Sequence, residues 1–328
     1  MGIRTNARAG KPTEPFGTGG FSRALLLALV ATVCSAAIAA PAQGANVWRQ
    51  TVTTAALDPA SASYVTELRR QVTKYGPWVN TWQYSSPLYS VSSSQPTVRV
   101  TLDVNNAALQ SAFNAVPLPP DARPADGTDE SLVVSQPSTN TLWEFWRLHK
   151  VSGVWHARWG GKMTNVSSNP GYFTSPHPDW GGTATSLSLS DGMIRVSEFQ
   201  NKRIDHAVAL AIPQARMNYF SLPAQRTDGS YNSTAAIPEG ARFRLDPTLN
   251  LNTLNLPPFV RTIADAAQRY GIILRDQAGA VTFYAEQPVS AKTDPYPAIF
   301  GHKDVMSQMK LFPWARLQTL KTDMRCCG

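Results

Sequence analysis

The sequence predicts a mainly β fold, an antiparallel, jelly-roll-like β-sandwich with two peripheral helices, and a β-barrel is the alternative. Roughly ten short stretches alternate apolar and polar residues or are rich in β-branched and aromatic side chains, as strands are. Turns rich in glycine, proline and asparagine separate them, in a chain of 328 residues with 21 glycines and 25 prolines. Because short turns rather than helices join the strands, we expect antiparallel pairing.

The first 42 residues have the pattern of a secretory signal peptide. A polar, basic segment (residues 1–23) precedes an apolar run (residues 24–40), and Ala40-Pro41-Ala42 fits a cleavage site. The run is short for a transmembrane helix, which needs about 20 apolar residues. We therefore expect a secreted protein, extracellular or associated with the cell wall, without stable membrane insertion after cleavage. An uncleaved membrane anchor is the alternative.

Residues 43–328 are expected to form a single β-rich domain with a C-terminal tail from about residue 288. Hydrophobic residues make up 43% of the chain, enough to furnish a core. The formal charge is +8, but the lysines and arginines are scattered and form no basic stripe, so we expect no nucleic-acid partner. Beyond the leader only Cys326 and Cys327 remain, which predicts no disulfide framework.

Two segments have the apolar spacing of helices. The first begins near Asp58-Pro59, an N-cap residue followed by proline at the first helical position, and ends at Gly76-Pro77. The second covers residues 259–270 and ends at Gly271, a residue type favoured just after a helix. We expect both helices at the periphery of the sheets.

A tryptophan-rich hairpin is predicted over residues 141–161, with its turn at Val151-Ser152-Gly153. Successive residues of a strand point to opposite faces, so Glu144 should lie on the face opposite Trp143 and Phe145. Together with the strand that precedes it, this hairpin forms a predicted three-stranded meander.

A later strand, residues 205–212, has His206 and three larger apolar residues on one face and three alanines on the other. The alanines indicate that another element packs closely behind them. Further strands are predicted at residues 98–104, 193–196, 219–222, 241–245, 272–274 and 281–285. Long loops are predicted at residues 117–129 and 162–182.

Motifs for metals, cofactors and nucleophilic catalysis are absent from the sequence. The five histidines form no H-E-x-x-H motif and no close Cys/His cluster, so we expect no metal ion. Neither Gly-x-Ser-x-Gly nor a glycine-rich phosphate loop occurs, so we expect no bound cofactor. A catalytic triad stays open, because triads are recognised by geometry rather than by sequence position.

Glu144 and His206 are the candidate catalytic residues. Glu144 lies between two aromatic residues in a predicted central strand, where burial would raise its pKa, as a general acid of a glycosidase requires. His206 follows Asp205 at the start of an otherwise apolar strand face. The alternative for Glu144 is a buried ion pair with an arginine, and for His206 it is a satisfied core histidine.

The candidates for substrate binding are arginines, aromatic residues and one aspartate. An arginine suits a substrate carboxylate by its bidentate geometry, and tryptophan and tyrosine rings stack on sugar faces. Core packing is the alternative for the aromatic residues, and an exposed turn salt bridge, worth little, is the alternative for the 226–228 turn. The candidates are Arg147, Trp155, Trp159, Trp180, Tyr219, Arg226 and Asp228.

The chain resembles an uncharacterised family of exported bacterial proteins at residues 129–161 and 201–286. The motifs that carry the resemblance include Leu142-Trp143-Glu144-Phe145, Arg203-Ile204-Asp205-His206-Ala207 and Gly240-Ala241-Arg242-Phe243-Arg244-Leu245. The resemblance implies export and one continuous domain, but no activity. Relatives often have a histidine near the position of Glu130 or Ser131, which this chain lacks.

Three functional hypotheses follow. The first is an exported polysaccharide hydrolase or lyase in which Glu144 and His206 act as acid and base. The second is a non-catalytic module that binds cell-wall or other glycans, and the third is a structural secreted protein whose aromatic residues all form core. The sequence leaves open whether the protein is an enzyme, and it does not predict an oligomeric state.

Overall fold

The computed structural model describes residues 45–289, 291 and 293–327, and the predicted signal peptide lies outside them. Strands outweigh helices and form several mixed sheets, which confirms a mainly β fold. Pairing is antiparallel only in part, because parallel pairs occur in both large sheets, and a jelly-roll-like sandwich is not confirmed. Among the described residues no sheet closes into a barrel.

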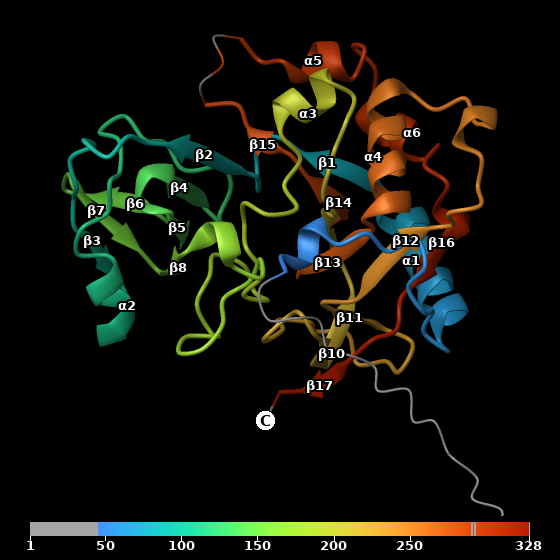
Figure 1. The fold of residues 1–328 in the computed structure, drawn as a ribbon, viewed down its shortest axis with the longest axis horizontal. Helices are drawn as coiled ribbons and strands as arrows, with labels where there is room; N and C mark the ends of the chain where they lie inside the picture. Colours follow the sequence, from blue (N-terminus) through green and yellow to red (C-terminus); the bar gives the residue numbers. More distant parts are fainter. Residues whose placement is uncertain (1–44, 290, 292, 328) are drawn as a thin grey trace, which may run out of the picture. The chain divides into compact units, whose positions relative to one another are not determined.

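The larger sheet has six strands and carries the main core of the protein. One of its faces packs against the two longest helices, α1 (Ser61–Tyr75) and α4 (Pro258–Arg269), which match the two predicted helices (Figure 1). In order across the sheet, the strands are β1 (Pro77–Asn80), β14 (Val281–Tyr284), β9 (Val208–Ile212), β13 (Ile272–Gln277), β12 (Arg242–Leu245) and β16 (Leu317–Thr319).

The alternation predicted for residues 205–212 is present in β9. Its larger apolar side chains face the helices, whereas Ala209 and Ala211 face a separate cluster that contains Trp48 and Leu187. The small side chains allow close approach, and the N–H of Ala209 donates to the carbonyl oxygen of Gly192 at 2.8 Å. The element expected behind the alanines is therefore the irregular segment 183–194, which is not a helix or a strand.

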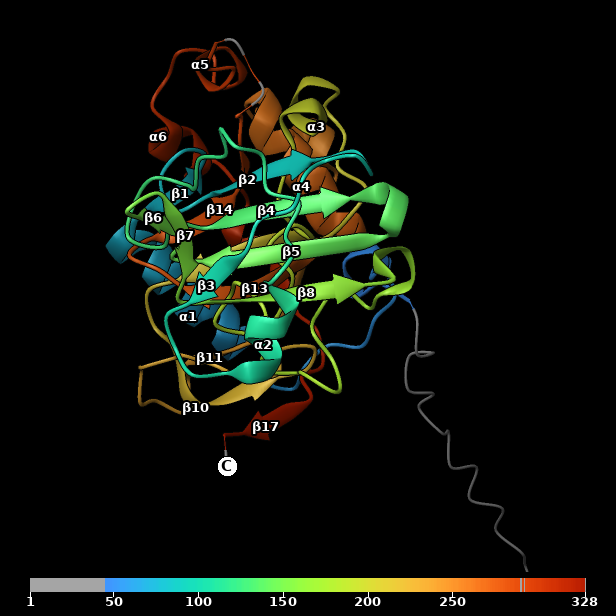
Figure 2. The same ribbon diagram turned by 90° about the vertical axis from the view of Figure 1, so that its left-hand side faces the viewer.

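A second sheet of five strands lies in front of the six-stranded sheet in Figure 2. The chain passes between the two sheets four times, after β1, β8, β14 and β15. The strands of the five-stranded sheet, in order, are β15 (Glu286–Gln287), β2 (Ser86–Ser90), β4 (Leu132–Gln136), β5 (Thr141–Trp146) and β8 (Trp159–Thr164). The antiparallel order β4-β5-β8 matches the predicted meander in its first two strands, but the third strand, β8, lies mostly beyond the predicted hairpin.

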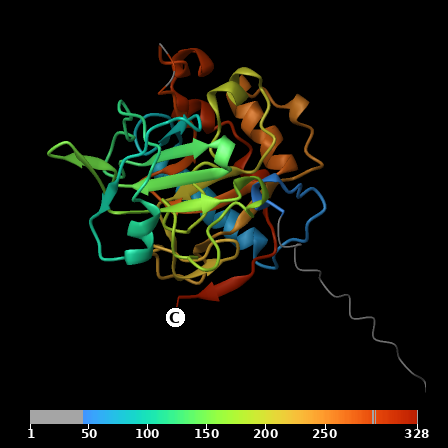
Figure 3. The ribbon, with the colours of Figure 1, turned by 60° about the vertical axis from the view of Figure 1, so that its left-hand side comes forward.

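The predicted hairpin at 141–161 divides between two sheets. Its base, β5 and β8, belongs to the five-stranded sheet, and its tip, β6 (His149–Val151) and β7 (Val154–Ala157), pairs with β3 (Val100–Leu102). This small sheet and α2 (Ala107–Ala112) share a core with the five-stranded sheet, on the side away from the six-stranded sheet (Figure 3).

The remaining elements lie around these layers. A third small sheet contains β11 (Ile237–Glu239), β10 (Ala215–Ser221) and β17 (Met324–Cys326). Four short helices of the described chain were not predicted: α2, α3 (Val196–Gln200), α5 (Tyr296–Ile299) and α6 (Val305–Met309). Cys326 and Cys327 are free and exposed. None of the described helices has the length and apolarity that a membrane span requires.

Leu68 tests the packing of α1 on the six-stranded sheet, because its side chain has no exposed surface. We expect Leu68→Ala to lower the free energy of unfolding by about 2–5 kcal/mol, through lost burial and the cavity left behind. Leu311→Ala, at a leucine that is 53% exposed, is the matched control and should cost far less. Equal losses in urea unfolding would contradict this packing.

Candidate functional site

An irregular segment, residues 182–191, lies between the two large sheets and is held by charged side chains from both. Glu144, on β5, has no exposed surface and binds the segment through both carboxylate oxygens. Its Oε1 accepts from the hydroxyl of Ser188 (2.8 Å) and the N–H of Leu189 (2.7 Å), and its Oε2 accepts from the N–H of Gly182 (3.3 Å). Glu144 is therefore a structural acceptor for backbone that has no sheet partner.

Arg275, on β13, holds the same segment from the other sheet. Its Nη1 donates to the carbonyl oxygens of Ser188 (3.3 Å) and Leu189 (3.0 Å). The guanidinium carbon lies 4.2 Å from the centroid of the Tyr284 ring, a cation–π contact. Glu144 thus binds the hydroxyl of Ser188 and the N–H of Leu189, and Arg275 binds the carbonyl oxygens of the same two residues.

Arg226 fixes the beginning of this segment. Its Nε donates to the hydroxyl of Ser186 (2.9 Å), and its Nη2 donates to the carbonyl oxygen of Thr183 (2.8 Å) and reaches that of Gly181 (3.5 Å). Burial lowers the pKa of Arg226. The 226–228 turn is therefore anchored on the segment rather than free in solvent.

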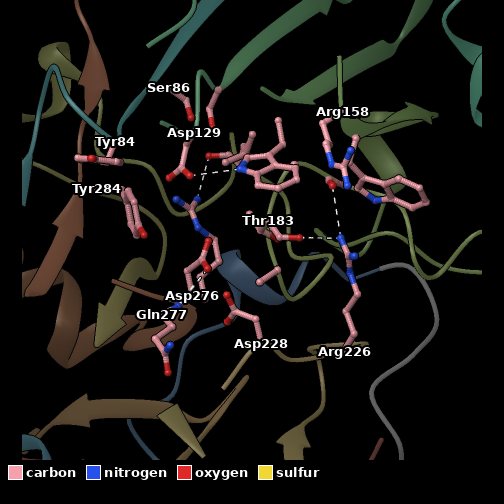
Figure 4. Close-up of a pocket in the computed structure, with 18 of the residues that line it drawn as sticks. Tyr84, Ser86, Asp129, Arg158, Thr183, Arg226, Asp228, Asp276, Gln277 and Tyr284 are labelled. Atoms are coloured by element: carbon pink, nitrogen blue, oxygen red, sulfur yellow. Dashed lines mark hydrogen bonds between the residues drawn. The ribbon is translucent and has the colours of Figure 1, made fainter. Parts of the chain in front are cut away.

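A cavity of about 670 Å³ lies beside this segment, between the two large sheets and the 226–228 turn. Figure 4 shows its labelled side chains converging from these elements. Its volume is within the range of about 300–1,000 Å³ that is usual for ligand pockets. Asp129, Trp146, Arg158, Trp159 and Tyr84 line it from the five-stranded sheet and its loops, and Arg275, Asp276, Tyr284 and Asp228 line it from the other side.

Three carboxyl groups meet at one side of this cavity. Asp228, Glu239 and Asp276 each place an oxygen atom within 4.8 Å of the other two. Glu239 has no exposed surface; its Oε2 accepts from the hydroxyl of Thr227 and from the N–H of Asp228, and its Oε1 has no partner among the described residues. Three acids this close cannot all ionise readily.

Desolvation raises the pKa of each of these acids, and the negative charge of neighbouring acids raises it further. The pKa of Asp276 rises to about 7, although the nearby guanidinium of Arg275 lowers it. The pKa of Glu239 is raised well above its ordinary value, by burial first and then by Asp228 and Asp276. At neutral pH the cluster therefore holds protons that it can donate.

A further carboxylate, Asp129, belongs to the opposite wall. It precedes β4, and its Oδ1 accepts from the indole N–H of Trp146 at 3.2 Å. Figure 4 shows Asp129 on one side of the cavity and Asp228 with Asp276 on the other. The cavity thus presents carboxyl groups from two sides to anything bound between them.

Aromatic rings complete the walls. Trp146 and Trp159 lie opposite each other in the antiparallel register of β5 and β8, and both line the cavity. Tyr84 is 43% exposed at the rim, and Tyr284 lies beneath Arg275. Such rings offer apolar faces, with polar groups beside them, to a ligand that has both kinds of surface.

The structure brings three of the predicted site residues to this cavity, namely Trp159, Arg226 and Asp228. Glu144 does not line it. Its predicted burial and raised pKa, to about 7, are present, but three donors occupy its carboxylate and it has no path to a ligand. The raised pKa of Glu144 therefore comes with a structural role and not with the predicted catalytic one.

His206 is not brought to the cavity either. It precedes β9, its Nε2 lies 3.1 Å from a carboxylate oxygen of Glu198, and its Nδ1 is bonded to the carbonyl oxygen of Ala207. A catalytic pair of Glu144 and His206 is therefore not formed, because each side chain is engaged within its own part of the fold.

The other predicted binding residues lie elsewhere. Arg147 is exposed and lies over the Trp146 ring, outside the cavity lining. Trp155 is part of the core near the hairpin tip, and Trp180 is buried and stacked on His177 at 3.9 Å between ring centroids. Tyr219 is exposed on β10 beneath Arg216.

Sequence reasoning missed Asp129, Glu239, Arg275 and Asp276. Arg275 and Asp276 could not be predicted because of a β-bulge in the pairing of β13 with β9. Leu274 pairs with Leu210, but Asp276 pairs with Ala211. The extra residue places consecutive side chains, Arg275 and Asp276, on the cavity. A sequence pattern of period two cannot show this.

The spacing of Asp228, Glu239 and Asp276 would also allow a cation to bind among them, so the expected absence of a metal stays a prediction. Comparisons with protein-family models, with curated proteins and with solved structures find no match to this chain. The site is therefore interpreted from its own geometry.

The burial of Glu144 predicts a specific dependence of stability on pH, because desolvation raises its pKa more than the hydrogen bonds from Ser188, Gly182 and Leu189 lower it. Its pKa is raised from 4.5 to about 7 on folding, so the folded state keeps a proton that the unfolded state releases between these values. The contribution of Glu144 to stability is full below 4.5 and is lost as the pH rises to about 7, in total roughly 3 kcal/mol.

Glu144→Gln removes this titration, and we expect its free energy of unfolding to depend less steeply on pH between 4.5 and 7 than that of the unmodified protein. Urea unfolding followed by tryptophan fluorescence measures both curves. Glu130→Gln, at a partly exposed glutamate, is the matched control. Parallel curves for Glu144→Gln and the unmodified protein would contradict the raised pKa of Glu144.

Proposed function

We propose that this protein is an exported enzyme that hydrolyses a polysaccharide, with its active site in the cavity between the two large sheets. The observation that carries the proposal is the presence of carboxyl groups on opposite walls of one aromatic-lined cavity. Glycosidases generally use such a pair of acids around the scissile bond. The signal-peptide pattern and the resemblance to exported bacterial proteins support the proposed location, outside the cell or at its wall.

In this proposal Asp276, protonated, donates its proton to the glycosidic oxygen. The bond between that oxygen and the anomeric carbon breaks, a water molecule attacks the anomeric carbon from the other side, and Asp129 accepts the proton that the water releases. One product gains a hydroxyl group from the donated proton and the other gains the hydroxyl group of the water. Enzymes that invert configuration separate the two carboxyl groups by roughly 6.5–9.5 Å to admit this water.

The surroundings of Asp276 suit the role of the acid. Burial first, and then the negative charges of Asp228 and Asp129, raise its pKa and favour its protonated form. Arg275 is bonded to backbone carbonyl oxygens instead of forming an ion pair with it. Trp146 and Trp159 supply ring faces for the sugar.

A non-catalytic glycan-binding module is the second candidate, because the same rings and acids could hold a glycan without cleaving it.

Asp276→Asn tests the enzyme against the binding module. Loss of a general acid lowers the rate by about 10²–10⁴-fold, so we expect reducing ends from a polysaccharide panel to be released that much more slowly, while glycan binding is retained. Asp265→Asn, on the surface of α4, is the matched control. Full activity of Asp276→Asn would contradict the assigned role, and binding without turnover by the unmodified protein would favour the module.

The unsaturated product that a lyase leaves absorbs ultraviolet light, and a hydrolysis product does not. The ultraviolet absorbance of the same digests therefore separates the two reactions, which both release reducing ends.

The pH profile gives an independent test. Because Asp276 must be protonated to donate, kcat/KM should fall as the pH rises above about 7, the pKa of this group. The charges that set this value come from Asp228 and Asp129 on the facing elements and from Arg275 beside it. Asp276→Asn should abolish the basic limb of the profile, and an unchanged limb in that variant would assign it to another group.

A further inference from the structure

Arg275 has hydrogen-bonding capacity that the fold does not use. Its side chain is 1% exposed, and only Nη1 makes hydrogen bonds with the described residues. Its Nε is buried without a partner, and its Nη2 likewise has no acceptor within the described part of the chain. An arginine that is always charged and lies in a cavity with free donors is costly unless something compensates it.

The acids in the cavity do not compensate its arginines. Within residues 45–327, apart from 290 and 292, no ion pair joins Arg158, Arg226 or Arg275 to a carboxylate. Arg275 does lie close enough to Asp276 to lower its pKa. Cations and acids therefore occupy one cavity without neutralising each other in pairs.

Arg158 is the second unpartnered cation. It follows β7 at the point where the hairpin changes sheets, its guanidinium has no hydrogen bond to another described residue, and it lines the cavity from the five-stranded sheet. Arg226 differs, because its Nε and Nη2 hold Ser186 and Thr183. Two guanidinium groups, from two walls, thus have donors available to one ligand.

We propose that Arg158 and Arg275 form a subsite for a negatively charged substituent of the sugar, so that the substrate is an acidic saccharide. A carboxylate, a sulfate or a phosphate presents the shared chemistry, oxygen atoms bearing negative charge that accept hydrogen bonds from a guanidinium in a fork. The inference rests on the proposed function, because it places this subsite in the same cavity as the acids.

The acids of the cluster do not prevent the binding of an anion. Burial raises the pKa of Glu239 well above its ordinary value and that of Asp276 to about 7, so both acids favour their neutral forms, which leaves Asp129 and Asp228 against three guanidinium groups. The charge of the cavity is then close to neutral or positive. A neutral sugar, in contrast, can accept hydrogen bonds from Arg275 but has no negative charge to balance the guanidinium.

Binding to paired oligosaccharides tests this inference. The pairs are an oligogalacturonate and its methyl ester, a sulfated galactan and its desulfated form, and a phosphorylated mannan and its dephosphorylated form, all with the full chain and by calorimetry. We expect at least one acidic member to bind about tenfold or more tightly than its neutral partner, since hydrogen bonds to charged groups are worth that much. Equal binding within every pair, or no binding of any acidic member, would overturn the inference.

Arg158→Gln should weaken binding of the acidic oligosaccharide about tenfold or more without changing that of the neutral partner, and Arg158→Lys should restore part of the difference because it keeps the charge. Arg69→Gln, at an exposed arginine on α1, is the matched control. Arg275→Lys tests the buried cation, and its circular dichroism spectrum reports whether the fold is kept. Unaltered selectivity in both Arg158→Gln and a folded Arg275→Lys would show that the arginines do not form the subsite.

The two proposals fail in different ways. Selective binding of an acidic oligosaccharide without its cleavage contradicts the proposed hydrolysis and leaves the anion subsite standing. Cleavage of a neutral glycan, with no preference for its acidic counterpart, contradicts the subsite alone.

Discussion

The hydrogen bonds of Glu144 and Arg275 to residues 188 and 189 are the interaction that joins the two large sheets around one cavity. The segment 182–191 belongs to neither large sheet, and only part of its backbone is paired with other backbone. Side chains therefore satisfy several of its remaining polar groups. Glu144 supplies acceptors from the five-stranded sheet, and Arg275 supplies donors from the six-stranded sheet. Among the described residues, no strand of one large sheet pairs with a strand of the other. Glu144 and Arg275 therefore link the two walls of the cavity through the segment 182–191.

The same arrangement accounts for the chemistry of the cavity. Arg275 and Arg226 direct donors to carbonyl oxygens, so they do not form ion pairs with Asp276 and Asp228. An aspartate paired with an arginine would have a lowered pKa and could not hold a proton at neutral pH. Burial raises the pKa of these acids, and because the cations are bound to backbone they lower it less than an ion pair would and keep unused donors. The proposed acid and the proposed anion subsite therefore have one cause, which is that the arginines bind backbone carbonyl oxygens and not the acids.

Features that depend on local periodicity could be predicted from the sequence, and features that depend on distant pairing could not. The helix before Gly76, the helix before Gly271 and the two faces of β9 all follow from spacing within a few residues. The parallel pairs β1–β14 and β2–β15 join segments far apart in the chain, and no local pattern specifies them. The sequence also could not show whether Glu144 is a structural or a catalytic acid, because burial raises the pKa of both kinds alike.

The bulge in β13 extends this argument to the residues that the sequence could not assign. In a regular strand, Arg275 and Asp276 would point to opposite faces, and one of them would enter the apolar core beneath α1 and α4. The bulge avoids that cost by placing both on the cavity, next to the alanines of β9 that leave room for the segment. One residue then holds the backbone between the sheets and its neighbour is the proposed acid. Any change in the register of β13 would alter both, so the stability of the inter-sheet layer and the geometry of the proposed site are set by the same local feature.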